Sequence, residues 1–298
     1  MKYIKRILNK IDPKLLVTIQ YFSHFHRFIN WKNPKDLNEK INWLKFNSDT
    51  TLWTLCADKF RVREYVSEKG LDDILVKFYG KWERIEDIDW FSLPNSFVMK
   101  TNNGSGDILV CKDKSKLNIE QTKKKYSALL SHSFSDTNGE PHYATMKPCL
   151  IIEEMLDCKK QHLATDSLID YKIWCFDGKP HNVFVCSNRC CDSLDIATYD
   201  LNWIRHDEYN IFSSHYRKTE LDIPKPKTLD RMLEIASKLS EGFPQVRIDL
   251  YEVDEKPYFG EMTFTSAGGF MNYFTPEYLM EMGELIDLSL AKNNNCIK

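Results

Sequence analysis

The stretch RIDLYEVDEKPYFGEMTFTSAGGF, residues 247–270, decides the fold predicted for this chain. Before Asp254 and Glu255, apolar and polar residues alternate with the period of a half-buried β-strand. The alternation resumes after Pro257, which can open a strand because a first position need not donate to the ladder. The stretch therefore predicts a β-hairpin with its turn at Asp254 and Glu255.

The register of this hairpin bears on function. If Val253 pairs with Pro257 across a three-residue turn, Asp249 lies opposite Glu261, and 247 lies opposite 263. Two such carboxylates are about 5 Å apart at Cβ and repel each other unless a cation lies between them. A divalent ion with oxygen ligands would fit. A solvated face with unrelated charges stays open, and a slip of one residue would separate the carboxylates.

Composition places the chain among ordinary globular proteins. It has 298 residues, of which 42% are apolar and 28% charged, and a net charge of −2. This length allows one large domain or two to three subdomains, and the charge gives no sign of a nucleic-acid groove. The nine cysteines form no CxxC pair, so we expect reduced thiols in a cytoplasmic protein and no zinc site.

The N-terminus alternates basic residues with Ile4, Ile7 and Leu8, which predicts an amphipathic helix. No apolar run in the chain approaches the length of a transmembrane span. Two alternatives stay open for this helix. It packs its apolar side on its own domain, or it contacts a membrane surface at the inner face of the membrane.

Periodicity predicts the remaining elements. Helices are expected at 36–47, 52–69, 118–131, 227–241 and 276–291, and strands at 75–79, 96–100, 148–156 and 196–203, with a second hairpin at 170–185. In the helix at 52–69, Asp58, Lys59 and Arg63 lie within about one turn, which favours a surface ion-pair group.

Three further places carry candidate binding residues. Lys100 precedes a loop in which Gly104 and Gly106 would let backbone amides approach phosphate oxygens, although an ordinary hairpin turn explains the loop equally well. The predicted strand at 148–156 contains Glu153 and Glu154, which bind something there or mark where the strand reaches solvent. Asp170 and Lys172 share one face of the second hairpin, where they hold a ligand or pair with each other.

Seven segments carry a family resemblance. They are NEKINWLKF, ADKFRVREYV, LPNSFVMKTNNGSGDILVCKD, IIEEML, DYKIWCFDGKP, VRIDLYEVDEKPYFGEMTF and SAGGF, which extend from residue 38 to 270. In order and spacing they resemble the ATP-grasp superfamily, and within it the teichuronopeptide-biosynthesis (TupA-like) branch, often found among genes for bacterial surface polysaccharides. The resemblance implies an α+β ATP-grasp fold in which two α+β lobes clamp ATP. It gives an N-terminal helical region at 1–72, a lid subdomain at 73–156 and a C-terminal subdomain at 157–298.

The resemblance also implies roles for single residues. Phosphates would be contacted by Lys100, Gly104, Ser105 and Gly106, adenine faced by Glu153, Glu154, Met155 and Leu156, and the ribose approached by Asp170. Lys172 would contact phosphate or substrate, and Arg247 would face the reacting group. Asp249, Glu261 and Thr263 would ligate Mg²⁺, with Thr263 standing where many ATP-grasp ligases carry Asn.

The activity implied is that of an ATP-dependent carboxylate–amine ligase with an acyl-phosphate intermediate. Its partners would be a small-molecule or glycan-linked carboxylate, such as a sugar acid, and an amine, such as an amino acid. One alternative is a glycosyltransferase, which commonly carries a DxD metal motif; no such triplet is expected in this chain, although glycosyltransferases without one exist. Another is a non-catalytic nucleotide-binding protein, although retained carboxylates that repel each other argue against it.

Overall fold

A computed structural model describes residues 2–292 except residues 105, 132–133, 164, 166 and 221. The helices are α1 (Lys2–Ile11), α2 (Pro13–Phe25), α3 (Leu37–Asn47), α4 (Thr51–Ala57), α5 (Val62–Glu68), α6 (Ile119–Leu130), α7 (Leu229–Ser240) and α8 (Pro276–Glu284). The strands are β1 (Phe78–Trp82), β2 (Phe97–Thr101), β3 (Ile108–Cys111), β4 (Leu150–Glu153), β5 (Asp170–Phe176), β6 (Lys179–Ser187), β7 (Leu194–Tyr199), β8 (Tyr216–Lys218), β9 (Val246–Val253) and β10 (Lys256–Thr263).

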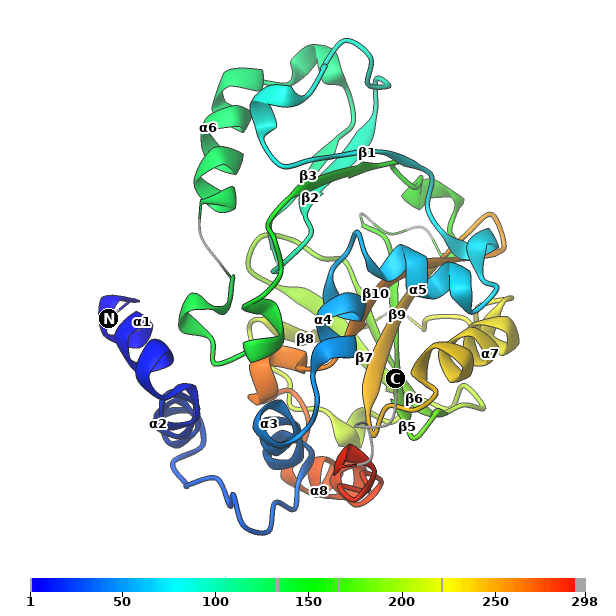
Figure 1. The fold of residues 1–298 in the computed structure, drawn as a ribbon. Helices are drawn as coiled ribbons and strands as arrows, with labels where there is room; N and C mark the ends of the chain where they lie inside the picture. Colours follow the sequence, from blue (N-terminus) through cyan, green and yellow to red (C-terminus); the bar gives the residue numbers. More distant parts are fainter. Residues whose placement is uncertain are drawn as a thin grey trace.

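The strands form two separate sheets, as the α+β prediction requires. The small sheet has the antiparallel order β1-β4-β2-β3, and the large sheet has the order β10-β9-β5-β6-β7-β8, in which only the β7–β8 pair is parallel. Figure 1 shows the small sheet with α6 above the large sheet, and the helices α3 and α8 below it. The limits predicted for the subdomains, at residues 72 and 156, stay a prediction.

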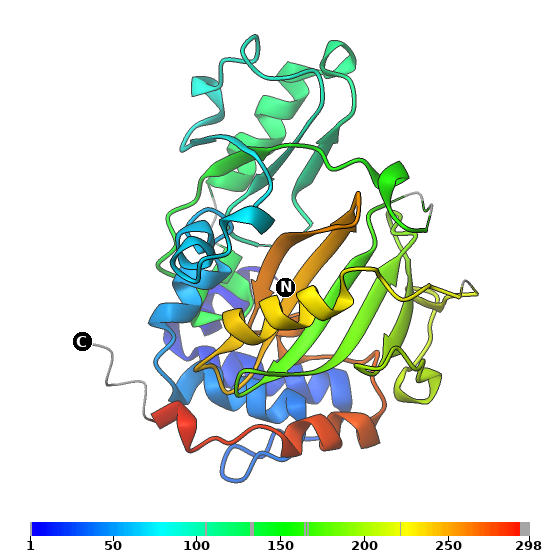
Figure 2. The same cartoon turned by 90° about the vertical axis from the view of Figure 1, so that its right-hand side faces the viewer.

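The large sheet has one apolar face and one charged face. Helix α7 covers the first, where Ile248 and Ile173 pair across β9 and β5, and Figure 2 shows α7 lying across these strands. The opposite face carries Lys172 beside Asp249, because side chains alternate along each strand. This alternation places the polar residues of β5, β9 and β10 together on the side that α7 does not cover.

The predicted hairpin at 247–270 forms, with a different turn. Val253 pairs with Lys256 across two residues, Asp254 and Glu255, both of which have positive φ. The predicted three-residue turn is therefore wrong, because the shorter primed turn matches the twist of the strands. The predicted opposition of Asp249 and Glu261 is nevertheless confirmed.

A bulge at Gly260 restores that opposition. Between Phe259 and Glu261 the register shifts by one residue, which compensates for the turn being one residue shorter than predicted. A Cβ at Gly260 would lie 2.9 Å from the carbonyl oxygen of Asp249 and 3.0 Å from the Tyr251 ring. Glycine at this position therefore permits the approach of the two strands beside the paired carboxylates.

The predicted helix at 52–69 is wrong in one respect, because it breaks into α4 and α5. The Asp58 carboxylate accepts hydrogen bonds from the backbone N–H groups of Phe60 and Arg61, at 2.9 and 3.1 Å. The Lys59 N–H donates to the carbonyl oxygen of Asn102, at 2.9 Å. These bonds replace those of a continuous helix and attach the break to the small-sheet lobe.

Other boundaries differ from the prediction as well: the strand expected at 148–156 is β4, which ends at Glu153, and the strand expected at 196–203 is β7, which ends at Tyr199. The strand expected at 75–79 is β1, which begins at Phe78. Before it, the Arg63 guanidinium donates a hydrogen bond to the carbonyl oxygen of Val76 at 2.9 Å. The helix expected at 276–291 ends at Glu284, and the Asp287 carboxylate accepts from the Ser289 N–H in a separate turn. A side-chain bond to the backbone lies next to each of these two ends.

Candidate active site

The charged face of the large sheet centres on Asp249, whose side chain is 1% exposed. Arg247 binds it bidentately, with Nε 2.7 Å from Oδ1 and Nη2 2.8 Å from Oδ2. Lys172 on β5 donates to Oδ2 as well. Two cations thus balance one buried carboxylate, which would be costly to bury alone.

Glu261 lies across the ladder from Asp249 and is more open, with 38% of its side chain exposed. Thr263 donates to its Oε1 at 3.2 Å, and the Arg247 guanidinium lies 3.6 Å from the same oxygen. Lys59, from the break between α4 and α5, lies 3.7 Å from Oε2. Arg247 therefore contacts both members of the carboxylate pair and separates their charges.

These neighbours hold Glu261 ionised. Burial raises the pKa of the Glu261 carboxyl, but Lys59, Lys172 and Arg247 outweigh burial and lower that pKa to about 2. The Lys172 ammonium has its pKa raised, because the attraction of Asp170 and Asp249 exceeds the opposing effect of burial. At neutral pH the face carries alternating fixed charges that a polyanionic ligand and a cation could both use.

Asp170 extends this network along β5. Its Oδ1 lies 3.5 Å from the Lys172 ammonium, and its Oδ2 accepts from Arg189 at 2.9 Å. Although burial raises the pKa of Asp170, Lys172 and Arg189 together lower it below its ordinary value. Arg189 is half exposed and lies in the loop after β6, so it adds a cation at the edge of the face.

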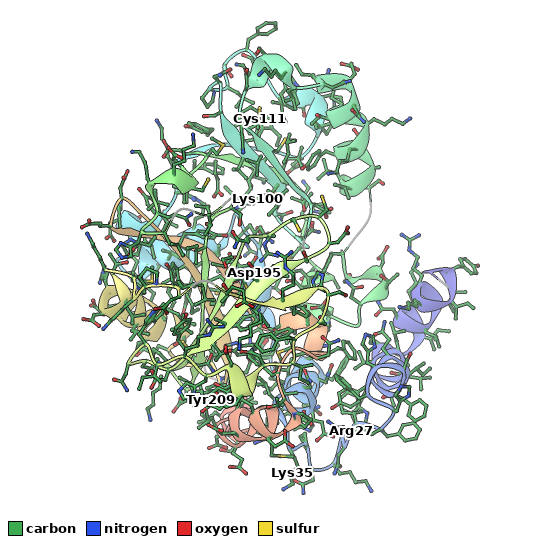
Figure 3. All side chains as sticks on the ribbon, turned by 180° about the vertical axis from the view of Figure 1, so that it is seen from behind. Arg27, Lys35, Lys100, Cys111, Asp195 and Tyr209 are labelled. Atoms are coloured by element: carbon green, nitrogen blue, oxygen red, sulfur yellow. The ribbon has the colours of Figure 1, made fainter. Side chains whose placement is uncertain are left out.

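A second charged group lies on the small sheet around Glu153 at the end of β4. Lys100 on β2 contacts Glu153 Oε2 at 2.7 Å, and Arg63 contacts Oε1 at 3.1 Å. In Figure 3, Lys100 lies at the end of the small sheet that faces the large sheet, whereas Cys111 lies at the far end. The Glu153 carboxylate thus holds two cations at the junction of the lobes.

The residues on either side of this group differ in accessibility. Glu154 is exposed, and its N–H donates to the carbonyl oxygen of Lys77 at 2.9 Å, while Met155 and Leu156 are half-buried beyond the end of β4. Gly104 and Gly106 both have positive φ, and the Gly104 carbonyl accepts from the Lys59 ammonium at 2.7 Å. The predicted phosphate contact of Ser105 lies outside the described residues.

The break between α4 and α5 connects the two groups. Asp58 caps the local turn and also accepts from the Asn102 amide at 2.8 Å, Lys59 reaches Glu261, and Arg63 reaches Glu153. The prediction of a surface ion-pair group for these three residues is therefore wrong. They point in three directions because the helix breaks between them, and two of them bring cations to the site.

A pocket of about 380 Å³ opens beside the Glu261 end of the network. Four residues of the predicted set line it: Gly104, Arg247, Glu261 and Thr263. Its wall does not include the other charged residues of the predicted set that the structure describes, namely Lys100, Glu153, Glu154, Asp170, Lys172 and Asp249. Glu140 also lines it, buried and hydrogen-bonded to Thr265 Oγ1 at 2.5 Å. Gln20 and His24 of α2 also line it.

The oxygen donors of this face are of the kind that suits Mg²⁺. Asp249 accepts three hydrogen bonds of the roughly four that its two oxygens offer, so Oδ1 keeps a free lone pair. Glu261 keeps exposed oxygen, and the Thr263 hydroxyl lies beside it. Hard oxygen donors of this kind suit Mg²⁺, which is usually held by one or two carboxylates plus phosphates.

The chain matches a known protein family. Residues 39–287 match the model described as TupA-like ATPgrasp. The chain belongs to the TupA-like ATP-grasp family. The match spans both sheets and every site residue predicted above, and it leaves α1 and α2 outside. The family prediction and the ATP-grasp fold prediction are thereby confirmed.

Comparison with solved structures finds low similarity to several ligases. This ATP-grasp chain is similar to D-alanine–D-alanine ligase from Bacillus anthracis, with a TM-score of 0.45 and 15% identity over 83% of this chain and 72% of that one. For the D-alanine–D-alanine ligase from Helicobacter pylori, the TM-score is 0.43 and the identity 12%, over 84% of this chain and 66% of that one. For phosphoribosylamine–glycine ligase from Thermotoga maritima, the TM-score is 0.40 and the identity 15%, over 73% of this chain and 50% of that one. No curated protein matches.

Several residues of this ATP-grasp site were not predicted from sequence as site residues, among them Lys59, Arg63 and Glu140. Lys59 and Arg63 lie within ADKFRVREYV, a segment that carried the resemblance, so the signal was present but had no assigned role. Glu140 lies in a polar loop whose sequence has no periodicity. The loop is attached to α4 beside the pocket, because the Thr54 hydroxyl donates to the backbone carbonyl oxygen of His142 at 2.8 Å.

The chain contains one DxD triplet, Asp87-Ile88-Asp89, although none was expected. Asp89 accepts from the Phe91 N–H at 3.1 Å, and Asp87 pairs with Arg84 at 3.2 Å. Both carboxylates thus serve a local turn of the small-sheet lobe. The triplet is absent from the wall of the pocket beside Glu261, so it gives the glycosyltransferase alternative no support.

Proposed function

We propose that this TupA-like ATP-grasp protein is an ATP-dependent carboxylate–amine ligase that forms ADP. The observation that carries the proposal is the paired carboxylates Asp249 and Glu261, held apart by Arg247 beside a pocket. The family match supports the use of ATP, and the oxygen donors support Mg²⁺. Roles of the individual residues below belong to the proposal.

In the proposed reaction, a carboxylate oxygen of the substrate attacks the γ-phosphorus of ATP, and ADP leaves. An amine then attacks the carbonyl carbon of the acyl phosphate, loses a proton, and phosphate leaves. Bound Mg²⁺, held by Asp249 and Glu261 with Thr263 beside them, would neutralise charge on the phosphates. No protein nucleophile is required, so the chain's contribution is to place charges and exclude water.

The cations of the chain have separate tasks in this scheme. Lys100 approaches the phosphates from the small sheet, where Glu153 orients its ammonium at 2.7 Å. Lys172 approaches from the large sheet, positioned between Asp170 and Asp249. Arg247 faces the pocket and donates to the oxygen on which charge develops as the carbonyl is attacked. Backbone amides near Gly104 and Gly106 close over the phosphates.

For the substrates, we propose a sugar acid of a bacterial surface polysaccharide as the carboxylate and an amino acid as the amine. The TupA-like branch of the family is the support for this choice. Glu140, which lines the pocket and has its pKa raised by burial, offers a carboxyl beside Thr265 that suits an amine. Substrate choice would then depend on the loop that carries Glu140.

The test is a mass-spectrometric screen of sugar acids against amino acids with ATP and Mg²⁺. The proposal expects ADP and an amide product only when both partners are present. Release of AMP would contradict it, and so would sugar transfer from a nucleotide sugar without ATP. The Glu261→Ala variant serves as the inactive control, with circular dichroism showing that it keeps the fold.

A further inference from the structure

Helix α1 contacts the protein through its polar side. Arg6 pairs with Asp136 at 3.0 Å, and the Asn9 amide donates to the carbonyl oxygen of Ser135 at 2.9 Å. The Asn9 side-chain oxygen also accepts from the Gly139 N–H at 3.1 Å. An amphipathic helix that served only its own domain would turn its apolar side inward instead.

The apolar side of α1 is exposed, and α2 continues the pattern. We define the N-terminal apolar surface by Ile4, Ile7, Ile11, Leu15, Ile19 and Phe22, all exposed and spaced three or four residues apart. Among the described residues, eight of the fifteen exposed large apolar side chains lie within the first 28 positions. Figure 1 shows α1 and α2 at one margin of the molecule.

Charge is concentrated on the same segment. Residues 1–35 contain eight of the chain's 41 Lys and Arg residues but only Asp12 of its 43 acidic residues. Their formal charge is therefore +7 in a chain whose net charge is −2, which leaves −9 for the rest. Lys10 is exposed next to the N-terminal apolar surface, and Lys5 is half-buried beside it.

We propose that α1 and α2 dock this protein on an anionic lipid bilayer, with the N-terminal apolar surface inserted at the headgroup boundary. Large apolar side chains flanked by lysines on one helix are the combination that binds anionic interfaces. A second copy of the chain is a poorer occupant, since residues 2–25 carry five Lys and Arg residues and only one acidic residue, Asp12, and two such basic surfaces repel each other when the same patch meets itself.

This docking leaves the protein on the bilayer surface. Among the residues that the structure describes, no helix has both the length and the apolar character needed to cross a membrane. Helix α2 also supplies Gln20 and His24 to the pocket beside Glu261, so the docking helices and the pocket share one element. The inference stands independently of the proposed ligase activity, because it requires neither ATP nor turnover.

The test is sedimentation of the full chain with vesicles, without ATP. One set contains phosphatidylcholine alone, and the other contains phosphatidylcholine and phosphatidylglycerol in equal parts. The proposal expects binding to the anionic vesicles only, weakening as salt rises above about 0.1 M. Failure to bind the anionic vesicles overturns the proposal, as does equal binding to both sets.

Two matched pairs of variants locate the surface. Ile4→Ser with Ile7→Ser, at sites 62% and 41% exposed, should lower the bound fraction by at least about tenfold. The control is Ile204→Ser with Ile211→Ser, at sites 58% and 42% exposed on the large-sheet lobe, and it should bind like the unsubstituted chain. Equal loss in both pairs overturns the proposal.

The charge pair is Lys5→Glu with Lys10→Glu, against Lys116→Glu with Lys124→Glu on the small-sheet lobe. Only the first pair should lower the fraction of protein bound to anionic vesicles, by at least about tenfold.

Sedimentation velocity without lipid tests self-association. If the unsubstituted chain forms a dimer that the Ile4→Ser, Ile7→Ser chain does not form, the surface binds a second copy of the chain and the bilayer proposal is overturned. Glu261→Ala should bind vesicles normally, which separates this inference from the ligase proposal.

Discussion

Asp249 and Glu261 lie opposite each other on β9 and β10, and the Arg247 guanidinium contacts both carboxylates. The predicted repulsion between them is therefore already relieved by a cation of the chain itself. Asp249 is fully buried and held by two cations, whereas Glu261 is 38% exposed and faces the pocket. Glu261 is the member that a ligand reaches first, which makes it the best site for substitution.

The bulge at Gly260 sets this opposition, so Gly260→Ala should disturb it. The added Cβ would lie 2.9 Å from the Asp249 carbonyl oxygen, and one strand would have to move. We expect a loss of about 1–3 kcal/mol in the free energy of unfolding and a larger fractional loss of ATP turnover. Urea unfolding and steady-state kinetics measure the two effects. Unchanged turnover would show that the bulge does not position Glu261.

Glu153 and Glu154 offer a matched pair of neighbouring carboxylates. Glu153→Gln removes the charge that Lys100 and Arg63 share, and it should cost about 2 kcal/mol of stability and raise the KM for ATP. Glu154→Gln, at an exposed position, should change neither quantity. If the two variants behave alike, Glu153 does not position Lys100.

Lys172→Met tests the bridge between Asp170 and Asp249. It leaves two buried carboxylates with less positive charge, so the free energy of unfolding should fall by about 2–3 kcal/mol at neutral pH. Lys172 and Arg189 lower the folded-state pKa of Asp170, so this stabilisation is present above the ordinary pKa of 3.8 and is lost as pH falls below it. The deficit of the variant should therefore shrink in acid, while Lys179→Met at an exposed site on β6 shows no deficit.

Lys59→Met tests the ionisation of Glu261. The pKa of Glu261 is lowered from 4.5 to about 2, so its contribution to stability is fully present above pH 4.5 and is lost as pH falls toward 2. Loss of Lys59 moves the folded-state pKa back toward 4.5. The stability difference between the two proteins should be larger at pH 6 than near pH 2, as thermal unfolding at a series of pH values measures. If the stability difference between the two proteins does not depend on pH, Lys59 stabilises the fold through its hydrogen bond to the Gly104 carbonyl oxygen and not by holding Glu261 ionised.

The face that carries the carboxylates could be predicted from sequence, but the path of the chain around it could not. Alternation along 247–253 and 256–263 put Asp249 and Glu261 on one face, and the apolar residues between them fixed which side is buried. The turn length was predicted wrongly by one residue, and the bulge at Gly260 cancelled that error. The bulge itself could not be predicted from the alternation of apolar and polar residues, because its one sign in the sequence is a glycine within the strand.

The contributions of Lys59 and Arg63 could not be read from sequence, because they depend on a helix break. The apolar stripe at 52–69 continues through the break, and helical spacing therefore predicted one helix with a surface ion-pair group. Asp58 overrides that pattern through two local bonds to the backbone. For α1 the pattern predicted an amphipathic helix correctly, but which side faces the protein depends on Asp136 and Ser135, more than a hundred residues away.

The central claim is that Glu261 and Asp249 hold the magnesium of a bound nucleotide. Isothermal titration with a non-hydrolysable ATP analogue, with and without Mg²⁺, tests it most directly. The unsubstituted protein should bind at least about tenfold more tightly with Mg²⁺, and Glu261→Ala should lose that gain while its circular dichroism spectrum shows that it keeps the fold. A Glu261→Ala protein with the same Mg²⁺ dependence as the parent would contradict the claim.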